Sequence, residues 1–157
     1  MSSHRQAERP ITILMVEDNP GDVRLTIEAL KENAIDHALY VAKDGIEALA
    51  FLRHEGAFAN APQPDLILLD INLPRKNGLE VLEVIKTDPA SKHIPVVVLT
   101  TSSSEDDIRR AYDRHANCYI TKPIDVWEFF DVVKSIKEFW QRIAQLPPSG
   151  NETLITG

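Results

Sequence analysis

Residues 65–78, which decide the fold, read DLILLDINLPRKNG. The apolar run from Leu66 to Leu69 has strand length and no polar side, which predicts a strand buried on both faces. The run ends in the carboxylate of Asp70. Open α/β sheets bind their ligands at the C-terminal ends of parallel strands, so we expect Asp70 to act as a nucleophile there.

Four more apolar runs of strand length lie on either side of this stretch, over residues 11–16, 39–42, 95–99 and 118–120. A helix follows each strand, and the clearest start is Asn19, which can cap a helix with Pro20 at its first position. That helix is expected to bury Val23, Ile27, Leu30 and Ala34. The alternation predicts a parallel sheet with helices on both faces, in one of the doubly wound strand orders.

The composition limits the possible partners. The chain has 157 residues, the size of one domain, and its 24 acidic and 17 basic residues give a net charge of −7. Because phosphate contacts need clustered Lys and Arg, we expect no binding to nucleic acid. No apolar run approaches the roughly 20 residues that span a bilayer.

The ends of the chain and its cysteine indicate the compartment. Residues 1–10, MSSHRQAERP, are expected to be a flexible leader without the apolar core of a signal peptide. The single cysteine, Cys118, cannot form an internal disulfide. Both features fit a cytoplasmic protein.

Four functional groups fall where predicted strands one, three, four and five end. They are the pair Glu17-Asp18, then Asp70, Thr100 and Lys122. Each alone has an ordinary explanation, because an acid can cap a helix, a threonine can end a strand and a lysine can be a solvated charge. A parallel sheet brings all four strand ends to one edge, and this coincidence favours a functional site.

The acidic groups at this edge predict a metal site. Carboxylates that lie close together repel one another unless a positive charge offsets them. A hard divalent cation does so, and oxygen ligands suit Mg²⁺. We expect Asp18 and Asp70 to bind Mg²⁺ directly and the main-chain oxygen of Asn72 to be a third ligand. Glu17 is expected to act through water.

Asp70 can also carry covalent chemistry. A carboxylate can attack phosphorus and form an aspartyl phosphate. Negative charge then spreads over the equatorial oxygens of the phosphoryl group. The Lys122 ammonium and the Thr100 hydroxyl can each stabilise one of these oxygens.

Over roughly residues 11–143 the chain resembles the receiver domains of response regulators, the CheY-like family. The resemblance rests on Glu17-Asp18, Asp70, Pro74, Gly78, Thr100, Tyr119 and Lys122-Pro123. It implies the flavodoxin-like strand order 2-1-3-4-5 and a signalling protein that is not an enzyme. It also implies that a sensor histidine kinase phosphorylates Asp70 in the presence of Mg²⁺, that Thr100 moves toward the phosphoryl group and that Tyr119 turns inward.

The same resemblance bears on three loop positions. It implies a cis bond between Lys122 and Pro123, which proline makes accessible at about 0.5–1 kcal/mol. It also implies that Ser102 tunes the lifetime of the phosphoryl group. Asn77 departs from the family, which often has Asp there, and we expect no effect on the chemistry.

The segment of residues 115–147 resembles more narrowly the single-domain regulators that partner phytochrome-type histidine kinases in cyanobacteria and other bacteria. The shared features are Asn117-Cys118-Tyr119, Phe139-Trp140 and Leu146-Pro147. The resemblance implies a kinase of that type as the partner and dimerisation through this region. Without a DNA-binding motif, the output is expected to be contact with a downstream protein that the sequence does not identify.

The last helix, expected over residues 125–143, carries more apolar surface than one surface helix needs. Beyond the stripe that faces the core, a second stripe consists of Val132, Phe139, Ile143 and Leu146. This stripe predicts a homodimer built on the fourth helix, the fifth strand and the fifth helix, together with the tail over residues 144–157. Alternatively, the tail folds back over the stripe within one chain. The fourth helix has the weakest apolar side, so we expect it to move most easily.

Two other classes of protein compete with this interpretation. One is a binding module with a receiver fold that is never phosphorylated, but such modules lack the carboxylate pair or the lysine, and both are present here. The other is a phosphatase that forms an aspartyl phosphate, which needs a second acid two residues after the nucleophile. That position is Asn72, which cannot serve as the acid.

Overall fold

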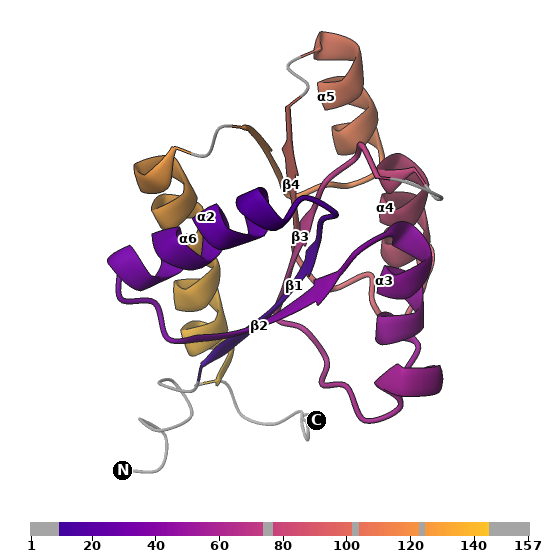
Figure 1. The fold of residues 1–157 in the computed structure, drawn as a ribbon, viewed down its shortest axis with the longest axis horizontal. Coiled ribbons are helices and arrows are strands. Elements are labelled where there is room, and N and C mark those ends of the chain that lie inside the picture. The colour runs from indigo at the N-terminus through magenta and orange to yellow at the C-terminus, as the bar shows by residue number, and fades with distance from the viewer. Residues whose placement is uncertain (1–9, 74–76, 102–103, 123–124, 145–157) are drawn as a thin grey trace.

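The computed structural model describes residues 10–144 apart from 74–76, 102–103 and 123–124. Its strands are β1 (Ile11–Val16), β2 (His37–Ala42), β3 (Leu66–Leu69), β4 (Val96–Thr100) and β5 (Cys118–Thr121). They form one parallel sheet in the order β2-β1-β3-β4-β5 (Figure 1). The expected doubly wound fold and its strand order are therefore confirmed.

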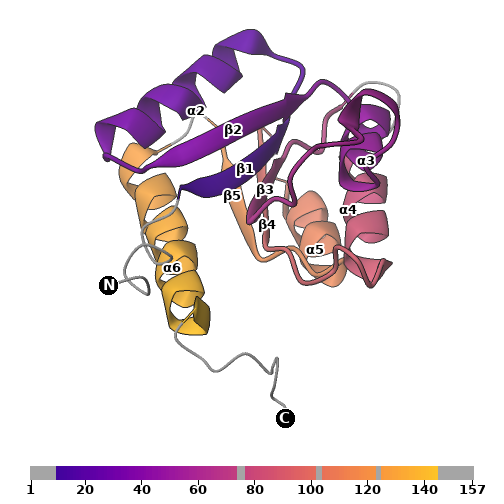
Figure 2. The same ribbon diagram turned by 90° about the horizontal axis from the view of Figure 1, so that it is seen from below.

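Helices cover both faces of this sheet. They are α2 (Pro20–Glu32), α3 (Gly45–Leu52), α4 (Gly78–Thr87), α5 (Glu105–Asp113) and α6 (Val126–Ala144), with a 3₁₀ turn, η1 (Gly56–Phe58), after α3. Figure 2 shows α2 and α6 on one face and α3, α4 and α5 on the other. This arrangement explains why the inner strands are apolar throughout, because neither face of them meets water.

The inner strands supply alternate residues to two separate cores. In β3, Ile67 and Leu69 pack with the side chains of α3, α4 and α5. Leu66 and Leu68 point the other way and pack with α2 and α6. All four side chains are fully or almost fully buried. A strand of this kind is held on both sides, which fixes the position of the residue that follows it.

The start of α2 agrees with the sequence prediction, and its end does not. The Asn19 side chain accepts hydrogen bonds from the N–H groups of Gly21 and Asp22, as a cap should. The helix ends at Glu32, so the expectation that Ala34 is buried on it is wrong. Ala34 is exposed with φ of +54°, and the next residue, Ile35, is buried in its place.

The boundaries of three strands, β2, β4 and β5, differ by one or two residues from those expected, and β5 ends one residue later, at Thr121. The edge strand β2 begins two residues earlier, at His37, where its side chains are only half-buried. β4 extends to Thr100, which pairs with Thr121 of β5. Thr100 is thus held in the sheet and does not lie in the loop that follows it.

The two helices that the sequence predicts to take part in a dimer, α5 and α6, differ in how much of them is described. In α5, Ala111 is the only fully buried residue and Tyr112 is 47% exposed, as the weak apolar pattern of that helix predicts. In α6, Phe129 and Val133 are buried, and Val132 is half-buried against the core below α2 and α6.

Several sequence predictions fall on positions outside the described part of the chain. They are the side chains of Phe139 and Ile143, together with Leu146, the leader and tail predictions, Ser102, Pro74 and the Lys122-Pro123 bond. Among the described residues, no helix combines the length and apolar character that crossing a membrane requires.

Candidate functional site

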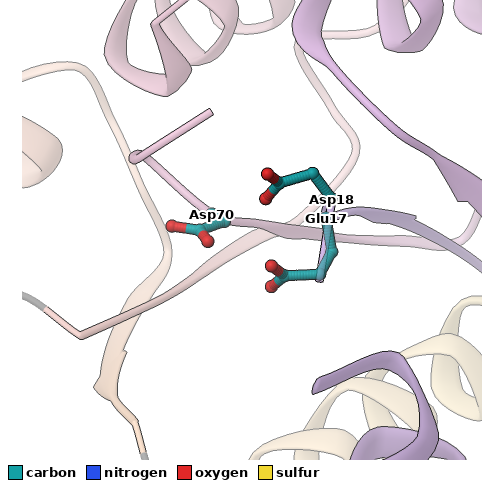
Figure 3. Close-up of side chains that lie close together, drawn as sticks. All are labelled: Glu17, Asp18 and Asp70. Carbon is teal, nitrogen blue, oxygen red and sulfur yellow. The ribbon is translucent and has the colours of Figure 1, made fainter. Parts of the chain in front are cut away.

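Three carboxylates meet where β1 and β3 end. Val16 and Leu69 are paired at the ends of these strands, so Glu17 and Asp18 follow β1 just beside Asp70. The main-chain N–H of Asp70 donates to the Val16 carbonyl at 3.1 Å, which extends the pairing by one residue. Oxygens of the three carboxylates lie within 4.8 Å of one another (Figure 3).

This group of oxygens has the chemistry of a cation site. Glu17 and Asp70 are 2% and 7% exposed, whereas Asp18 is open to solvent. Three negative charges at this separation repel strongly when two of them are buried. Hard divalent cations prefer such oxygen ligands, and a cation with bound water can use the open side at Asp18. The donor set therefore fits a divalent metal ion.

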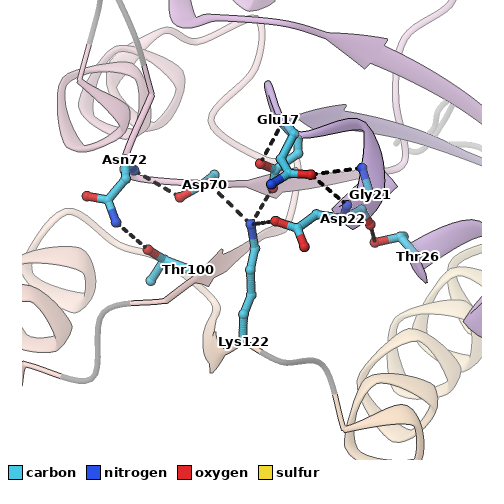
Figure 4. Close-up of polar contacts among 9 residues, drawn as sticks. Glu17, Gly21, Asp22, Thr26, Asp70, Asn72, Thr100 and Lys122 are labelled. Atoms are coloured by element: carbon cyan, nitrogen blue, oxygen red, sulfur yellow. Dashed lines mark hydrogen bonds and ion pairs between the residues drawn. The ribbon is translucent and has the colours of Figure 1, made fainter. Parts of the chain in front are cut away.

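Lys122 brings a positive charge to the same place from the end of β5 (Figure 4). Its Nζ lies 2.5 Å from Glu17 Oε1, 2.8 Å from Asp22 Oδ2 and 3.3 Å from Asp70 Oδ2. The Lys122 side chain is 6% exposed, so these contacts are shielded from water. Its main-chain N–H donates to the Thr100 carbonyl at 2.7 Å, which fixes its origin relative to β4.

The charges in this cluster shift the pKa values of two groups. Burial raises the pKa of Glu17 to about 6, and the neighbouring charge of Asp70 adds to this, while the hydrogen bond from Lys122 opposes it. Burial alone would lower the pKa of Lys122, but its hydrogen bonds to Asp22 and Glu17 raise it above the ordinary value. The ion pair therefore keeps the lysine charged without fully offsetting the burial of Glu17.

Asn72 connects Asp70 to Thr100. The Asn72 main-chain N–H donates to Asp70 Oδ1 at 2.9 Å, and its side-chain amide donates to the Thr100 hydroxyl at 3.0 Å. Thr100 is fully buried at the end of β4. The amide thus holds the threonine hydroxyl at the same edge of the sheet as the Asp70 carboxylate.

Gly78 holds the backbone that follows Asp70 close to the start of α4. A Cβ atom at this position would clash with the Ile71 Cα and the Asp70 carbonyl oxygen. The Gly78 N–H donates to the Ile71 carbonyl at 3.1 Å. Asn77 caps the helix and forms a capping box with Glu80. This close approach admits only glycine and holds the start of α4 against Asp70 and Ile71.

The structure brings together six of the residues predicted for the site: Glu17, Asp18, Asp70, Asn72, Thr100 and Lys122. Tyr119 lies on β5 opposite Val98 and is half-buried against the core below α3, α4 and α5. Asp22, in the first turn of α2, also belongs to the cluster, and it was not among the predicted site residues. The signal in the sequence was a further carboxylate four residues after Asp18, in the first turn of the helix that Asn19 caps.

Comparison with known proteins shows which family the sequence matches. The family model of the response regulator receiver domain matches residues 13–134. The response regulator Rcp1 of Synechocystis sp. is 49% identical over 142 residues, which are 90% of this chain and 97% of that protein.

Two solved structures resemble this fold and share about half of its sequence. The phosphorylated cyanobacterial phytochrome response regulator RcpA is 54% identical, with a TM-score of 0.73 over 88% of this chain and 99% of that one. The Mn²⁺-bound form of Rcp1 is 50% identical, with a TM-score of 0.72 and the same coverage.

Proposed function

Since the chain belongs to the response regulator receiver family, we propose that it accepts a phosphoryl group on Asp70 from a sensor histidine kinase. One observation carries this proposal: Asp70 follows a strand buried on both faces and lies beside two other carboxylates and the Lys122 ammonium. A carboxylate in this place has both a charge to attack phosphorus and a cation beside it.

The metal in this proposal is Mg²⁺. Asp18 and Asp70 would hold it directly with the main-chain oxygen of Asn72, and Glu17 would contribute through a bound water. When bound, the ion offsets the charge of the carboxylates and of the phosphoryl oxygens. The Mn²⁺-bound form of the relative Rcp1 supports a divalent ion in this family.

The transfer itself uses residues of this chain. An Asp70 carboxylate oxygen bonds to phosphorus as the bond between phosphorus and the histidine nitrogen of the kinase breaks. The Lys122 ammonium, 3.3 Å from Asp70 Oδ2, stands where it can meet one phosphoryl oxygen. The Thr100 hydroxyl, now bonded to the Asn72 amide, can turn to meet another.

Asn72 separates this proposal from a phosphatase. A hydrolase that works through an aspartyl phosphate needs an acid near the nucleophile to protonate the leaving group. An amide has no proton to give at neutral pH. The chain is therefore proposed to store the phosphoryl group as a signal and not to turn over a substrate.

The signal is proposed to leave the site through β4 and β5. Thr100 moves toward the phosphoryl group, Tyr119 turns inward behind it, and the surface around α5, β5 and α6 changes its contacts. The kinase is proposed to be of the phytochrome type, because RcpA is a phytochrome response regulator of 54% identity. The protein would act in the cytoplasm on a downstream protein.

The phosphoacceptor is tested by mass. The protein is incubated with acetyl phosphate and Mg²⁺, and the intact mass is recorded with time. We expect one phosphoryl adduct in the wild type and in Asp113→Asn, an exposed acid on α5. The adduct should be absent in Asp70→Asn and after addition of a chelator. A wild type that gains no adduct in Mg²⁺ contradicts the proposal.

The kinase is tested by phosphotransfer. Equal amounts of a ³²P-labelled phytochrome-type histidine kinase and of a labelled kinase of another sensor type are mixed with the protein. We expect the label to pass faster from the phytochrome-type kinase. Equal or slower transfer would contradict the proposal of a phytochrome-type kinase, but it would not affect the proposal that Asp70 is the phosphoacceptor.

We also propose a homodimer that uses α5, β5, α6 and the tail over residues 144–157, following the apolar stripe of Val132, Phe139, Ile143 and Leu146. Sedimentation of the phosphorylated protein tests it. The double variant Phe139→Ala with Ile143→Ala should sediment as a lighter species than the wild type. Unchanged sedimentation would exclude this stripe as the interface.

A further inference from the structure

Lys122 has three carboxylate partners, and the one from α2 has no place in the chemistry described so far. An ammonium has three N–H donors. In this structure they face Glu17, Asp22 and Asp70, and the Asp22 contact of 2.8 Å is shorter than the Asp70 contact of 3.3 Å (Figure 4). The lysine is thus held at least as closely by its helical partner as by the residue that it serves.

The position of Asp22 is fixed by the start of α2. Its main-chain N–H donates to the Asn19 cap at 3.2 Å, and its carbonyl accepts from the Thr26 hydroxyl at 3.0 Å. Thr26 is buried, so this turn is anchored in the core. The Asp22 carboxylate therefore stands at a set distance from the end of β5.

We propose that Asp22 is a positioning residue that competes with the phosphoryl group on Asp70 for the Lys122 ammonium. This rests on the proposed function of Asp70. A phosphorylated aspartate carries more negative charge than a free carboxylate and presents three acceptor oxygens. The donor of Lys122 that faces Asp70 is the one available to a phosphoryl oxygen, but the contacts with Glu17 at 2.5 Å and Asp22 at 2.8 Å hold the ammonium 3.3 Å from Asp70. The ammonium can close on that oxygen only by loosening one of these two shorter contacts.

The burial of the two other carboxylates decides which contact is released. The Glu17 side chain is 2% exposed, and a buried carboxylate that loses its partner has a high energetic cost. The Asp22 side chain is 27% exposed, so water can replace the ammonium there. Asp22 is thus the partner that Lys122 leaves. The free energy lost with this contact offsets part of the stabilisation that Lys122 gives to the phosphoryl group.

Beryllofluoride, a phosphoryl analogue that binds to aspartate, provides an equilibrium test. It is titrated at saturating Mg²⁺ and followed by ¹⁹F NMR. Without the competing carboxylate, Asp22→Asn should bind beryllofluoride about threefold to tenfold more tightly than the wild type. Asp22→Glu, which restores the charge, should bind within about twofold of the wild type.

Two controls separate this competition from other effects of the substitution. Glu28→Gln removes the same charge from an exposed position further along α2 and should leave the affinity unchanged. Salt screens the repulsion between charges that face solvent, but it screens an ion pair that is shielded from water much less. The gain in Asp22→Asn should therefore keep at least half its size when KCl rises from about 0.05 M to about 0.5 M.

The outcomes are distinguishable. Affinity in Asp22→Asn equal to or weaker than that of the wild type, in protein whose thermal melting shows it to be folded, overturns the proposal. A gain that Glu28→Gln shares, or that salt abolishes, overturns it as well. If the wild type itself binds no beryllofluoride and forms no adduct with acetyl phosphate, the proposed function of Asp70 fails, which is a different result.

Discussion

Two aspartates stand at opposite ends of the same strand, and only one of them is the proposed phosphoacceptor. Asp65 precedes β3 and Asp70 follows it. They are 6% and 7% exposed, so burial does not distinguish them. The groups around them do.

Asp65 faces backbone. Its carboxylate accepts the main-chain N–H of Thr12 at 2.9 Å, and its own N–H donates to the Thr12 carbonyl at 2.7 Å. This pair of hydrogen bonds joins the starts of β1 and β3, so the Asp65 carboxylate has a structural role there.

Asp70 faces other charges. It receives the Asn72 N–H, but its second oxygen points to Lys122, and two more carboxylates lie within 4.8 Å. Like charges grouped in this way repel one another unless a cation offsets them, and such groups are typical of functional sites. The difference teaches that the surroundings of an acid, and not its depth, indicate its role.

The largest expected effect is on phosphorylation. Asp70→Asn should abolish the adduct formed from acetyl phosphate, whereas Asp65→Asn should retain it, because the asparagine oxygen can still accept the Thr12 N–H. Intact mass after equal incubation measures both. If folded Asp65→Asn also lost the adduct, the two ends of β3 would not be separable.

Next in size is the stabilisation by metal. An ion that binds only the folded chain adds about 2.7 kcal/mol to the free energy of unfolding at a concentration one hundred times its Kd. Mg²⁺ should therefore raise the unfolding midpoint of the wild type and of Asp65→Asn in urea. Asp70→Asn should gain much less, and a chelator should remove the difference. An equal gain in Asp70→Asn would place the metal elsewhere.

The third effect concerns Asp65, at the start of β3, and the free energy of unfolding. Asp65→Ala leaves the half-buried Thr12 N–H without this acceptor, which should lower the free energy of unfolding by about 1–3 kcal/mol. Asp70→Ala removes one negative charge from a cluster of three that repel one another. Its free energy of unfolding should therefore fall less than that of Asp65→Ala, or rise. Urea unfolding without Mg²⁺ compares the two. A larger loss in Asp70→Ala would reverse the roles assigned to them.

The fold and its strand order could be predicted from the sequence because buried parallel strands have a simple signature. Apolar runs such as residues 66–69 and 96–99 have no polar face, and each is followed by a helix start. Parallel topology then places every strand end at one edge. For this reason Asp70, Thr100 and Lys122, far apart in sequence, were expected to meet, and the structure places them together.

Other features depend on geometry that periodicity does not carry. The contact of Asp22 with Lys122 depends on how far a lysine stem reaches from the end of β5 to the first turn of α2. The direct ion pair of Glu17 with Lys122 has the same origin. The contact of Glu17 with a metal through water stays a prediction. The end of α2 before Ala34 reflects competition from Asn33, whose side-chain amide donates to the Ala29 carbonyl and closes the helix.

The smallest expected effect is a dependence of stability on pH at the charged end alone. Burial raises the pKa of Glu17 from 4.5 to about 6, so between these values the folded chain holds a proton that the unfolded chain has lost. The resulting stability is fully present below pH 4.5 and is lost as the pH rises through 6. Its size is about 1–2 kcal/mol.

Glu17→Gln tests this dependence, because glutamine resembles the protonated acid at every pH. Without metal, the variant should be more stable than the wild type at pH 7 by about 1–2 kcal/mol, and the two should converge near pH 4.5. If Glu17→Gln were instead less stable at pH 7, the ion pair with Lys122 would outweigh burial, and the charged end would support the fold as the Asp65 end does.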